Sequence, residues 1–169
     1  MLAWHKARPR LAVTVHAAIC LALLTFALIS QYVFHLLPCV LCLWQRAPYA
    51  LVTAIAIVSL MIERRWAPWI LVSFAVLYVV EAGIAFFHVG VQAEWWAGTS
   101  GCGFHSNKGS DIADLYAQIK AAPITSCKDV TWKFLGFSMA FWNVIVASAL
   151  AVFSAVQAWV QAPWWTATK

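Results

Sequence analysis

Four long runs of apolar residues alternate with shorter polar stretches along this chain. We expect helices at about 11–31, 43–62, 68–88 and 139–160, each close to the roughly 20 residues that cross a bilayer as a helix. Backbone groups inside lipid must find hydrogen-bond partners within their own segment, which favours helices over isolated strands. The pattern predicts an all-α integral membrane protein, a four-transmembrane-helix bundle that forms one domain over residues 1–169.

The composition supports a membrane protein. Of 169 residues, 64% are hydrophobic and 10% are charged, whereas a soluble domain has about a quarter charged residues. The net charge is +5, but Lys and Arg are scattered instead of forming a basic patch, which argues against a nucleic-acid partner. The first apolar run is longer than the core of a signal peptide, so we expect it to stay as a helix.

The basic residues predict the orientation of the bundle. Lys6, Arg8 and Arg10 precede the first run, and Arg64 and Arg65 separate the second from the third. Cytoplasmic loops are enriched in such residues. We therefore expect both termini on the cytoplasmic side of the membrane. The cytoplasmic segments would be 1–10, 63–67 and 161–169, and the periplasmic loops 32–42 and 89–138.

The long loop 89–138 is expected to carry a short amphipathic helix. Ile112, Leu115, Tyr116 and Ile119 recur at helical spacing, and Pro123 follows them. Such a helix could lie on the membrane surface with its apolar side down, or it could pack on the bundle itself.

Four of the five cysteines form two pairs just outside the apolar runs, on the predicted periplasmic side, where disulfides persist. Cys39 and Cys42 form a Cys-x-x-Cys unit after Pro38, at the expected start of the second helix, with Arg46 one turn later. A helix N-terminus and a nearby cation lower the pKa of a thiol, so we interpret the unit as a redox pair. The alternative is a structural disulfide that only holds the loop and takes no part in redox chemistry.

A metal site is not expected at these cysteines. Structural zinc takes about four ligands at characteristic spacings. Cys102, Cys127, His88 and His105 could add to Cys39 and Cys42, but they lack the usual paired spacing. The prediction is therefore a site without a metal.

Cys102 and Cys127 are 25 residues apart, a reasonable span for a disulfide. Glycines flank Cys102 and are expected to leave it open to a large partner, although such a disulfide could also serve only to brace the loop. Cys20 is different, because it lies 19 residues before Cys39, about 28 Å away along a helix. We expect it to be a small buried residue outside the redox chemistry.

Several segments together resemble the DsbB family, the disulfide-forming quinone reductases of bacterial inner membranes. The resemblance covers essentially the whole chain. Its segments are Leu37-Pro38-Cys39-Val40-Leu41-Cys42, Gln45-Arg46, His88, Cys102-Gly103-Phe104, Cys127 and Trp132-Lys133-Phe134-Leu135-Gly136-Phe137.

The resemblance implies an enzyme that re-oxidises a DsbA-like periplasmic thioredoxin-fold protein and passes the electrons to ubiquinone or menaquinone. The partner would attack the Cys102–Cys127 disulfide at Cys102, and Cys127 would then exchange with Cys39. Cys42 would face the quinone. Arg46 would stabilise negative charge on the quinone oxygen and the thiolate, and His88 would hydrogen-bond the quinone or relay a proton.

Three other functions remain open from the residues alone. A non-catalytic membrane assembly protein could use its disulfides to brace a loop, and a reductant could move electrons outward, although that needs a cytoplasmic thiol or cofactor. A vitamin-K-epoxide-reductase-like quinone-linked enzyme shares the four-helix plan, but the second cysteine pair would be placed differently. Glu81 and His16, inside expected helices, are interpreted as hydrogen-bonded packing residues, with quinone proton uptake as the alternative for Glu81.

Overall fold

The computed structural model describes residues 9–61, 66–99, 102 and 125–161. Its elements are α2 (Pro9–Tyr32), α3 (Val40–Trp44), α4 (Arg46–Ser59), α5 (Ala67–Gln92), β1 (Lys133–Phe134), β2 (Phe137–Ser138) and α7 (Met139–Gln161). Helices α3 and α4 follow each other as one apolar segment, so the described part holds four segments long and apolar enough to cross a membrane. The predicted fold class, a four-helix membrane bundle, is confirmed.

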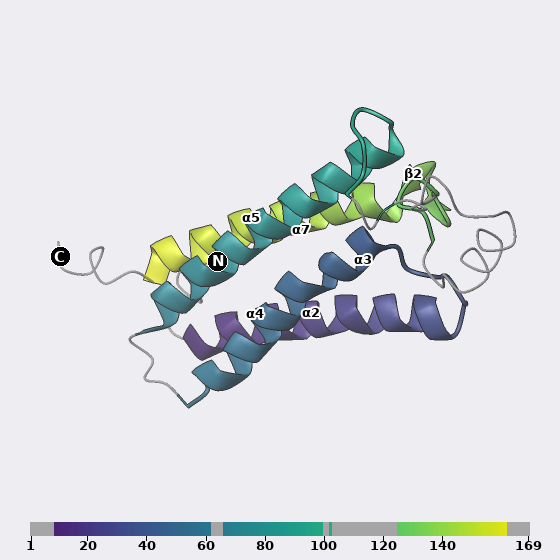
Figure 1. Cartoon of the computed structure of the whole chain (residues 1–169). Helices are drawn as coiled ribbons and strands as arrows, with labels where there is room; N and C mark the ends of the chain where they lie inside the picture. The colour runs from purple at the N-terminus through teal and green to yellow at the C-terminus, as the bar shows by residue number, and fades with distance from the viewer. Residues whose placement is uncertain (1–8, 62–65, 100–101, 103–124, 162–169) are drawn as a thin grey trace, which may run out of the picture.

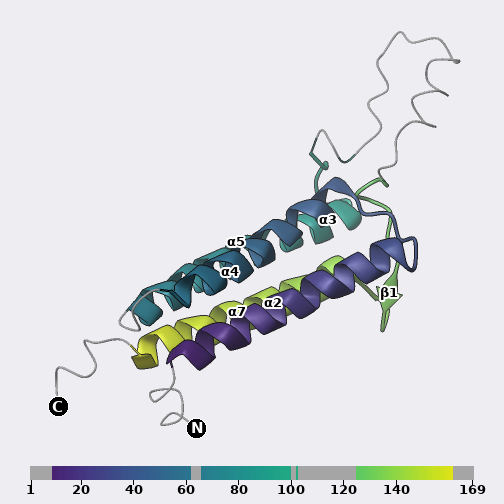
Figure 2. The same cartoon turned by 90° about the horizontal axis from the view of Figure 1, so that it is seen from below.

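The helices pack side by side as an elongated bundle (Figures 1 and 2). Helix α5 packs most extensively on α7, α2 packs on α4, and α4 joins the two pairs through α5. Direct contact between the backbones of α2 and α7 is slight. The first residues of α2 and the last residues of α7 lie at the same end of the bundle (Figure 2).

The close packing of α5 on α7 follows from small side chains. The buried face of α7 consists largely of alanines, with Ser154 among them, and small residues allow membrane helices to approach closely. The Ser154 hydroxyl donates a hydrogen bond to the carbonyl of Leu71 on α5, at 2.9 Å. Apolar contacts and one buried hydrogen bond therefore hold α5 and α7 together.

Two helices extend beyond their expected bounds. Helix α5 continues to Gln92 instead of ending near 88, and the second segment begins at Val40 instead of 43. Cys39 allows this earlier start, because its side chain accepts a hydrogen bond from the backbone N–H of Cys42 and caps α3. The amphipathic helix expected around 112–119 lies outside the described residues.

A short antiparallel hairpin precedes α7, where only loop was expected. Lys133 pairs with Ser138 and Phe134 with Phe137. Leu135 and Gly136 form the turn, both with positive φ, at 51° and 84°. A two-residue turn of this hand suits the twist of a hairpin, and glycine adopts it without steric cost.

Candidate redox site

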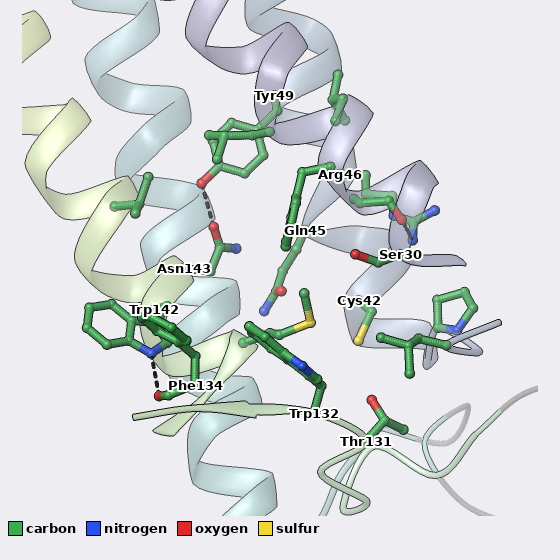
Figure 3. Close-up of a pocket in the computed structure, with 18 of the residues that line it drawn as sticks. Ser30, Cys42, Gln45, Arg46, Tyr49, Thr131, Trp132, Phe134, Trp142 and Asn143 are labelled. Carbon is green, nitrogen blue, oxygen red and sulfur yellow. Dashed lines mark hydrogen bonds between the residues drawn. The ribbon is translucent and has the colours of Figure 1, made fainter. Parts of the chain in front are cut away.

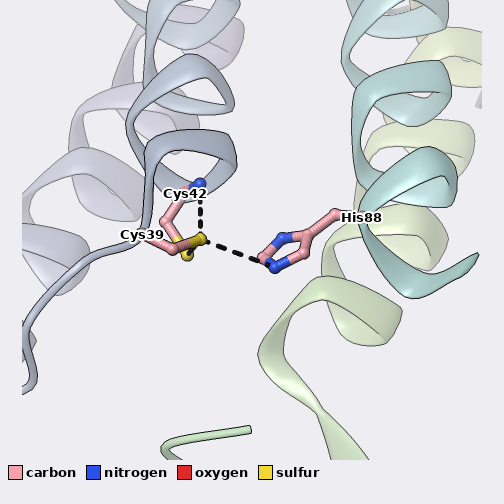
Figure 4. A group of neighbouring side chains, drawn as sticks. All are labelled: Cys39, Cys42 and His88. Atoms are coloured by element: carbon pink, nitrogen blue, oxygen red, sulfur yellow. Dashed lines mark hydrogen bonds between the residues drawn. The ribbon is translucent and has the colours of Figure 1, made fainter. Parts of the chain in front are cut away.

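Cys39 and Cys42 meet at the first turn of α3 (Figure 4). Their Sγ atoms lie 2.8 Å apart, and the N–H of Cys42 donates to the Sγ of Cys39 at 3.2 Å. A three-residue spacing returns to the same face of a helix, which brings the two sulfurs together without any contribution from the rest of the fold. The pair is therefore arranged to form and break a disulfide with little backbone movement.

The surroundings of Cys39 favour its protonated form. Its hydrogen bond with Cys42 raises the pKa of the Cys39 thiol, and burial raises that pKa further. The sequence-based expectation of a lowered thiol pKa is therefore wrong for Cys39. The helix N-terminus is present as expected, but the neighbouring sulfur and the loss of solvent outweigh its effect.

His88 contacts the sulfur of Cys39 from α5 (Figure 4). Its Nε2 lies 3.5 Å from the Sγ of Cys39, and its Nδ1 lies 3.3 Å from the side-chain nitrogen of Gln45. The imidazole is 2% exposed. His88 is thus placed to exchange a proton with Cys39, whereas it is not among the residues that line the larger cavity beside Cys42.

A cavity of about 270 Å³ lies on the other side of Cys42 (Figure 3). Its wall is mostly apolar, and it also includes Cys42, Arg46, Gln45 and Asn143. An engineered cavity of about 150 Å³ accommodates benzene, so this volume suits a substituted ring. A quinone head group, which is a flat ring with polar oxygens, fits a cavity of this size and lining.

Arg46 is held in place at this cavity by α2. Its Nη1 donates to the side-chain oxygen of Gln31 at 2.6 Å, and its Nη2 donates to the carbonyl of Ala27 at 3.4 Å. Neither partner carries a formal charge, so the positive charge of the guanidinium is not cancelled by an ion pair there. Gln31 was missed in the sequence, where its only signal is a polar residue at the end of an apolar run. Gln45 was named there only as part of the Gln45-Arg46 segment, without a role.

The structure joins Cys102 and Cys127 by a disulfide. Both pairs belong to one buried cluster, in which Cys39, Leu41, Val91, Cys102 and Cys127 pack together with Cys42 at the edge. Cys102 is 5% exposed, so the expectation of an open Cys102 is wrong. Gly98 packs so closely on Cys102 that a side chain at position 98 would collide with it.

The other singled-out residues are buried within the bundle. Cys20 is 0% exposed, as expected for a packing residue, and its Sγ lies 3.2 Å from the Tyr78 hydroxyl. His16 lies between the Tyr78 hydroxyl and the side-chain oxygen of Gln157, at 3.1 and 2.9 Å. These contacts agree with a packing role for His16.

Cys39, Cys42 and His88 also form a candidate metal group. Their ligand atoms lie within 4.8 Å of one another. Structural zinc takes four protein ligands, and the described residues supply three. The three residues are of types that bind zinc. Their two sulfur atoms, however, are in contact at 2.8 Å, which suits disulfide exchange.

A family model described as "Disulfide bond formation protein DsbB" matches residues 9–157. The chain belongs to the DsbB family. It is therefore a multi-pass membrane thiol–disulfide oxidoreductase that generates disulfides in a quinone-linked reaction. This assignment decides against the non-catalytic assembly protein and the vitamin-K-epoxide-reductase-like enzyme.

Curated relatives agree with membership of the DsbB family. Disulfide bond formation protein B of Acidovorax sp. (strain JS42) is 30% identical over 86% of this chain and 84% of the relative. The protein of the same name from Polaromonas sp. (strain JS666) is 27% identical over 89% of this chain and 91% of the relative. An uncharacterized Rickettsia prowazekii protein, RP370, is 27% identical over 77% of this chain and 76% of its own length. No solved structure matches the chain.

Proposed function

We propose that this protein re-oxidises a DsbA-like thioredoxin-fold partner and delivers the electrons to ubiquinone or menaquinone through its two cysteine pairs. The reduced partner attacks the Cys102–Cys127 disulfide at Cys102 and forms a mixed disulfide, releasing the Cys127 thiolate. The second thiol of the partner then releases the oxidised partner. Two electrons and two protons enter the enzyme in each cycle.

Cys127 next attacks the Cys39–Cys42 disulfide at Cys39, which forms a Cys127–Cys39 bond and releases the Cys42 thiolate. Cys102 then attacks Cys127, which restores the Cys102–Cys127 bond and leaves Cys39 and Cys42 reduced. The supporting observation is that all four cysteines pack in one cluster, while Cys42 also lines the cavity. Thiol–disulfide exchange requires sulfur atoms to come into contact. A cluster with one member at the cavity provides an ordered route from partner to quinone.

Arg46 and His88 have separate tasks in this proposal. Arg46 lines the cavity with Cys42, where its fixed charge stabilises negative charge that develops on the Cys42 sulfur or on a quinone oxygen. His88 lies at Cys39 and accepts or returns the proton of that thiol. A cofactor-binding role for His88, as first expected, is less well supported than this contact with Cys39.

The quinone enters from the side of the bundle. Exposed apolar side chains rim the cavity, with Phe26 on α2, Phe134 on β1, and Leu37 and Trp132 in the loops. In a membrane protein such a rim faces lipid or the interfacial region, which is where quinones dissolve. We place the protein in the bacterial inner membrane, with both termini cytoplasmic and the cysteine loops periplasmic, as the basic residues indicate.

The test combines the purified protein, a reduced DsbA-type partner and a soluble ubiquinone analogue, with quinone absorbance as the readout. We expect turnover that disappears in Cys42→Ala, and a mixed disulfide at Cys102 that accumulates when the reduced partner lacks its second cysteine and cannot release itself. Cys20→Ala is the matched control, because it removes a buried thiol outside the cluster, and it should keep turnover. Undiminished quinone reduction in Cys42→Ala would overturn the proposal.

A further inference from the structure

The cavity beside Cys42 has polar groups on two opposite sides (Figure 3). Cys42, Arg46 and Ser30 lie on one side, and Asn143 of α7 lies across from them, beside Trp142. The wall between these sides is largely apolar. A ligand that fills the cavity therefore meets hydrogen-bonding groups at both of its ends.

The amide of Asn143 is held in one orientation by two neighbours. The Tyr49 hydroxyl donates to its Oδ1 at 2.6 Å (Figure 3). Its Nδ2 donates to Oε1 of Glu81 at 2.5 Å. The tyrosine hydroxyl donates and the carboxyl oxygen accepts, so this orientation of the amide satisfies both contacts. In this orientation the oxygen of Asn143 accepts from Tyr49, and its nitrogen donates to Glu81.

One donor of Asn143 remains for a ligand. An amide nitrogen carries two hydrogens, and Glu81 takes one of them. The described residues provide no recorded acceptor for the other, whereas Asn143 itself lines the cavity. The side chain therefore presents an N–H to whatever occupies that space.

Glu81 explains why this orientation is maintained. It is 0% exposed in the middle of α5, and its second oxygen, Oε2, has no hydrogen-bond partner among the described residues. An ionisable side chain inside a membrane helix is costly, and its presence points to function. Packing alone does not require a glutamate here, because an apolar side chain would fill the same space at lower cost.

We propose that Asn143 donates a hydrogen bond to the quinone carbonyl farther from Cys42 and Arg46, and that Glu81 and Tyr49 are positioning residues for its amide. The inference rests on the proposed quinone site. A 1,4-quinone carries two carbonyls at opposite ends of its ring, and Arg46 and Asn143 supply one polar anchor at each side of the cavity. Both anchors together fix the ring beside the Cys42 sulfur.

The experiment measures quinone affinity as well as turnover. Trp132 and Trp142 line the cavity, so quenching of tryptophan fluorescence by a short-chain ubiquinone analogue reports equilibrium binding, and steady-state kinetics give KM and kcat. We expect Asn143→Leu to weaken binding and raise KM by about tenfold, the size expected for one hydrogen bond in a binding site. Stoichiometric oxidation of the reduced partner without added quinone should not change.

Variants of Glu81 separate positioning from a general loss of structure. Glu81→Gln keeps an acceptor oxygen for Asn143 and should leave KM within about twofold, whereas Glu81→Leu removes the acceptor and should raise KM about fivefold. Tyr49→Phe loses only the hydroxyl and should raise KM about threefold. If Asn143→Leu does not fold, Tyr49→Phe tests the same hydrogen-bonded group.

The matched control is Gln157→Leu. Gln157 lies on α7 like Asn143 but does not line the cavity, so this variant should bind quinone normally.

Wild-type affinity in both Asn143→Leu and Tyr49→Phe would overturn the inference while leaving the quinone site intact. Equal losses in Glu81→Gln and Glu81→Leu would overturn the positioning role. If wild-type protein oxidises its partner but neither binds nor reduces the quinone analogue, the proposed quinone site itself fails, and the inference fails with it.

Discussion

The two cysteine pairs are built in different ways. Cys39 and Cys42 are neighbours on one helical turn, and their sulfurs lie 2.8 Å apart without a bond between them. Cys102 and Cys127 come from segments 25 residues apart and are joined by a disulfide. The first pair is held by its own backbone, whereas the second pair itself holds two segments together.

This difference suits two tasks. A pair fixed by a helix keeps its geometry in both redox states, which favours repeated electron transfer to a ligand in a preformed cavity. A pair that links distant segments changes its surroundings when the bond opens, which favours exchange with a large protein. Because Cys102 is buried, partner binding must uncover it before attack.

The largest effect is expected when one cysteine pair is removed and the electrons that the protein accepts are counted. The oxidised wild-type protein without quinone should oxidise two equivalents of reduced partner, one for each disulfide. A Cys39→Ala, Cys42→Ala double variant should oxidise one equivalent and lose at least about a thousandfold in quinone-coupled turnover, because the nucleophile itself is missing. Thiol counting after acid quench measures the first value. Two equivalents in the double variant would contradict separate roles for the pairs.

Removal of the Arg46 charge should affect only the pair at the cavity. Arg46→Met keeps a long apolar stem but loses the guanidinium, and we expect kcat for quinone reduction to fall about a hundredfold, as for other lost preorganised charges. Stopped-flow measurement of partner oxidation should show no change in the first exchange. Gln31→Leu, which removes only a partner of Arg46, is the graded control and should lose less. A slowed first exchange in Arg46→Met would mean that the two pairs are not independent.

Stability should respond only to the pair that links distant segments. Opening a loop of about 25 residues is expected to cost about 3 kcal/mol of unfolding free energy, so Cys102→Ala, Cys127→Ala should unfold locally more easily. A disulfide between Cys39 and Cys42 closes a loop of very few residues. The Cys39→Ala, Cys42→Ala variant should therefore change the free energy of unfolding little. Limited proteolysis between positions 102 and 127 measures the difference, and helix content by circular dichroism should stay constant. Equal protease resistance in both double variants would contradict a stabilising role that belongs only to the Cys102–Cys127 disulfide.

The smallest effect concerns the proton on Cys39. Its pKa is raised first by the hydrogen bond to Cys42 and then by burial. A raised pKa keeps the thiol protonated, so alkylation of reduced Cys39 by iodoacetamide should become fast only at alkaline pH. Cys42→Ala removes the first cause and should move the alkylation midpoint to lower pH. Mass spectrometry of the Cys39 peptide against pH measures this midpoint, and an unmoved midpoint would assign the shift to burial alone.

The sequence was a good guide to what depends on neighbouring residues. The four apolar segments follow from runs of hydrophobic residues, and the contact between Cys39 and Cys42 follows from their three-residue spacing. The cap at the start of α3 also lies within that short stretch. Such features need no knowledge of which helices pack together.

Features that depend on tertiary contacts could not be predicted in the same way. His88 lies 49 positions from Cys39, and Asn143 lies 62 positions from Glu81, so only the helix arrangement reveals that each pair is in contact. The flanking glycines suggested an open Cys102, but at Gly98 the small residue instead allows the backbone to pack against it. A glycine indicates freedom or close approach, and the sequence alone does not distinguish these.

The cavity beside Cys42 is lined by residues of both α2 and α7, whose backbones make little direct contact. This arrangement has a pharmacological consequence. A compound that reaches the cavity past the apolar rim dissolves first in the bilayer, so its effective concentration depends on its partition coefficient and on the amount of lipid present. Apparent inhibition constants for apolar competitors should therefore rise as lipid or detergent is added at fixed total drug. Comparisons of potency between preparations are meaningful only at a stated lipid-to-protein ratio.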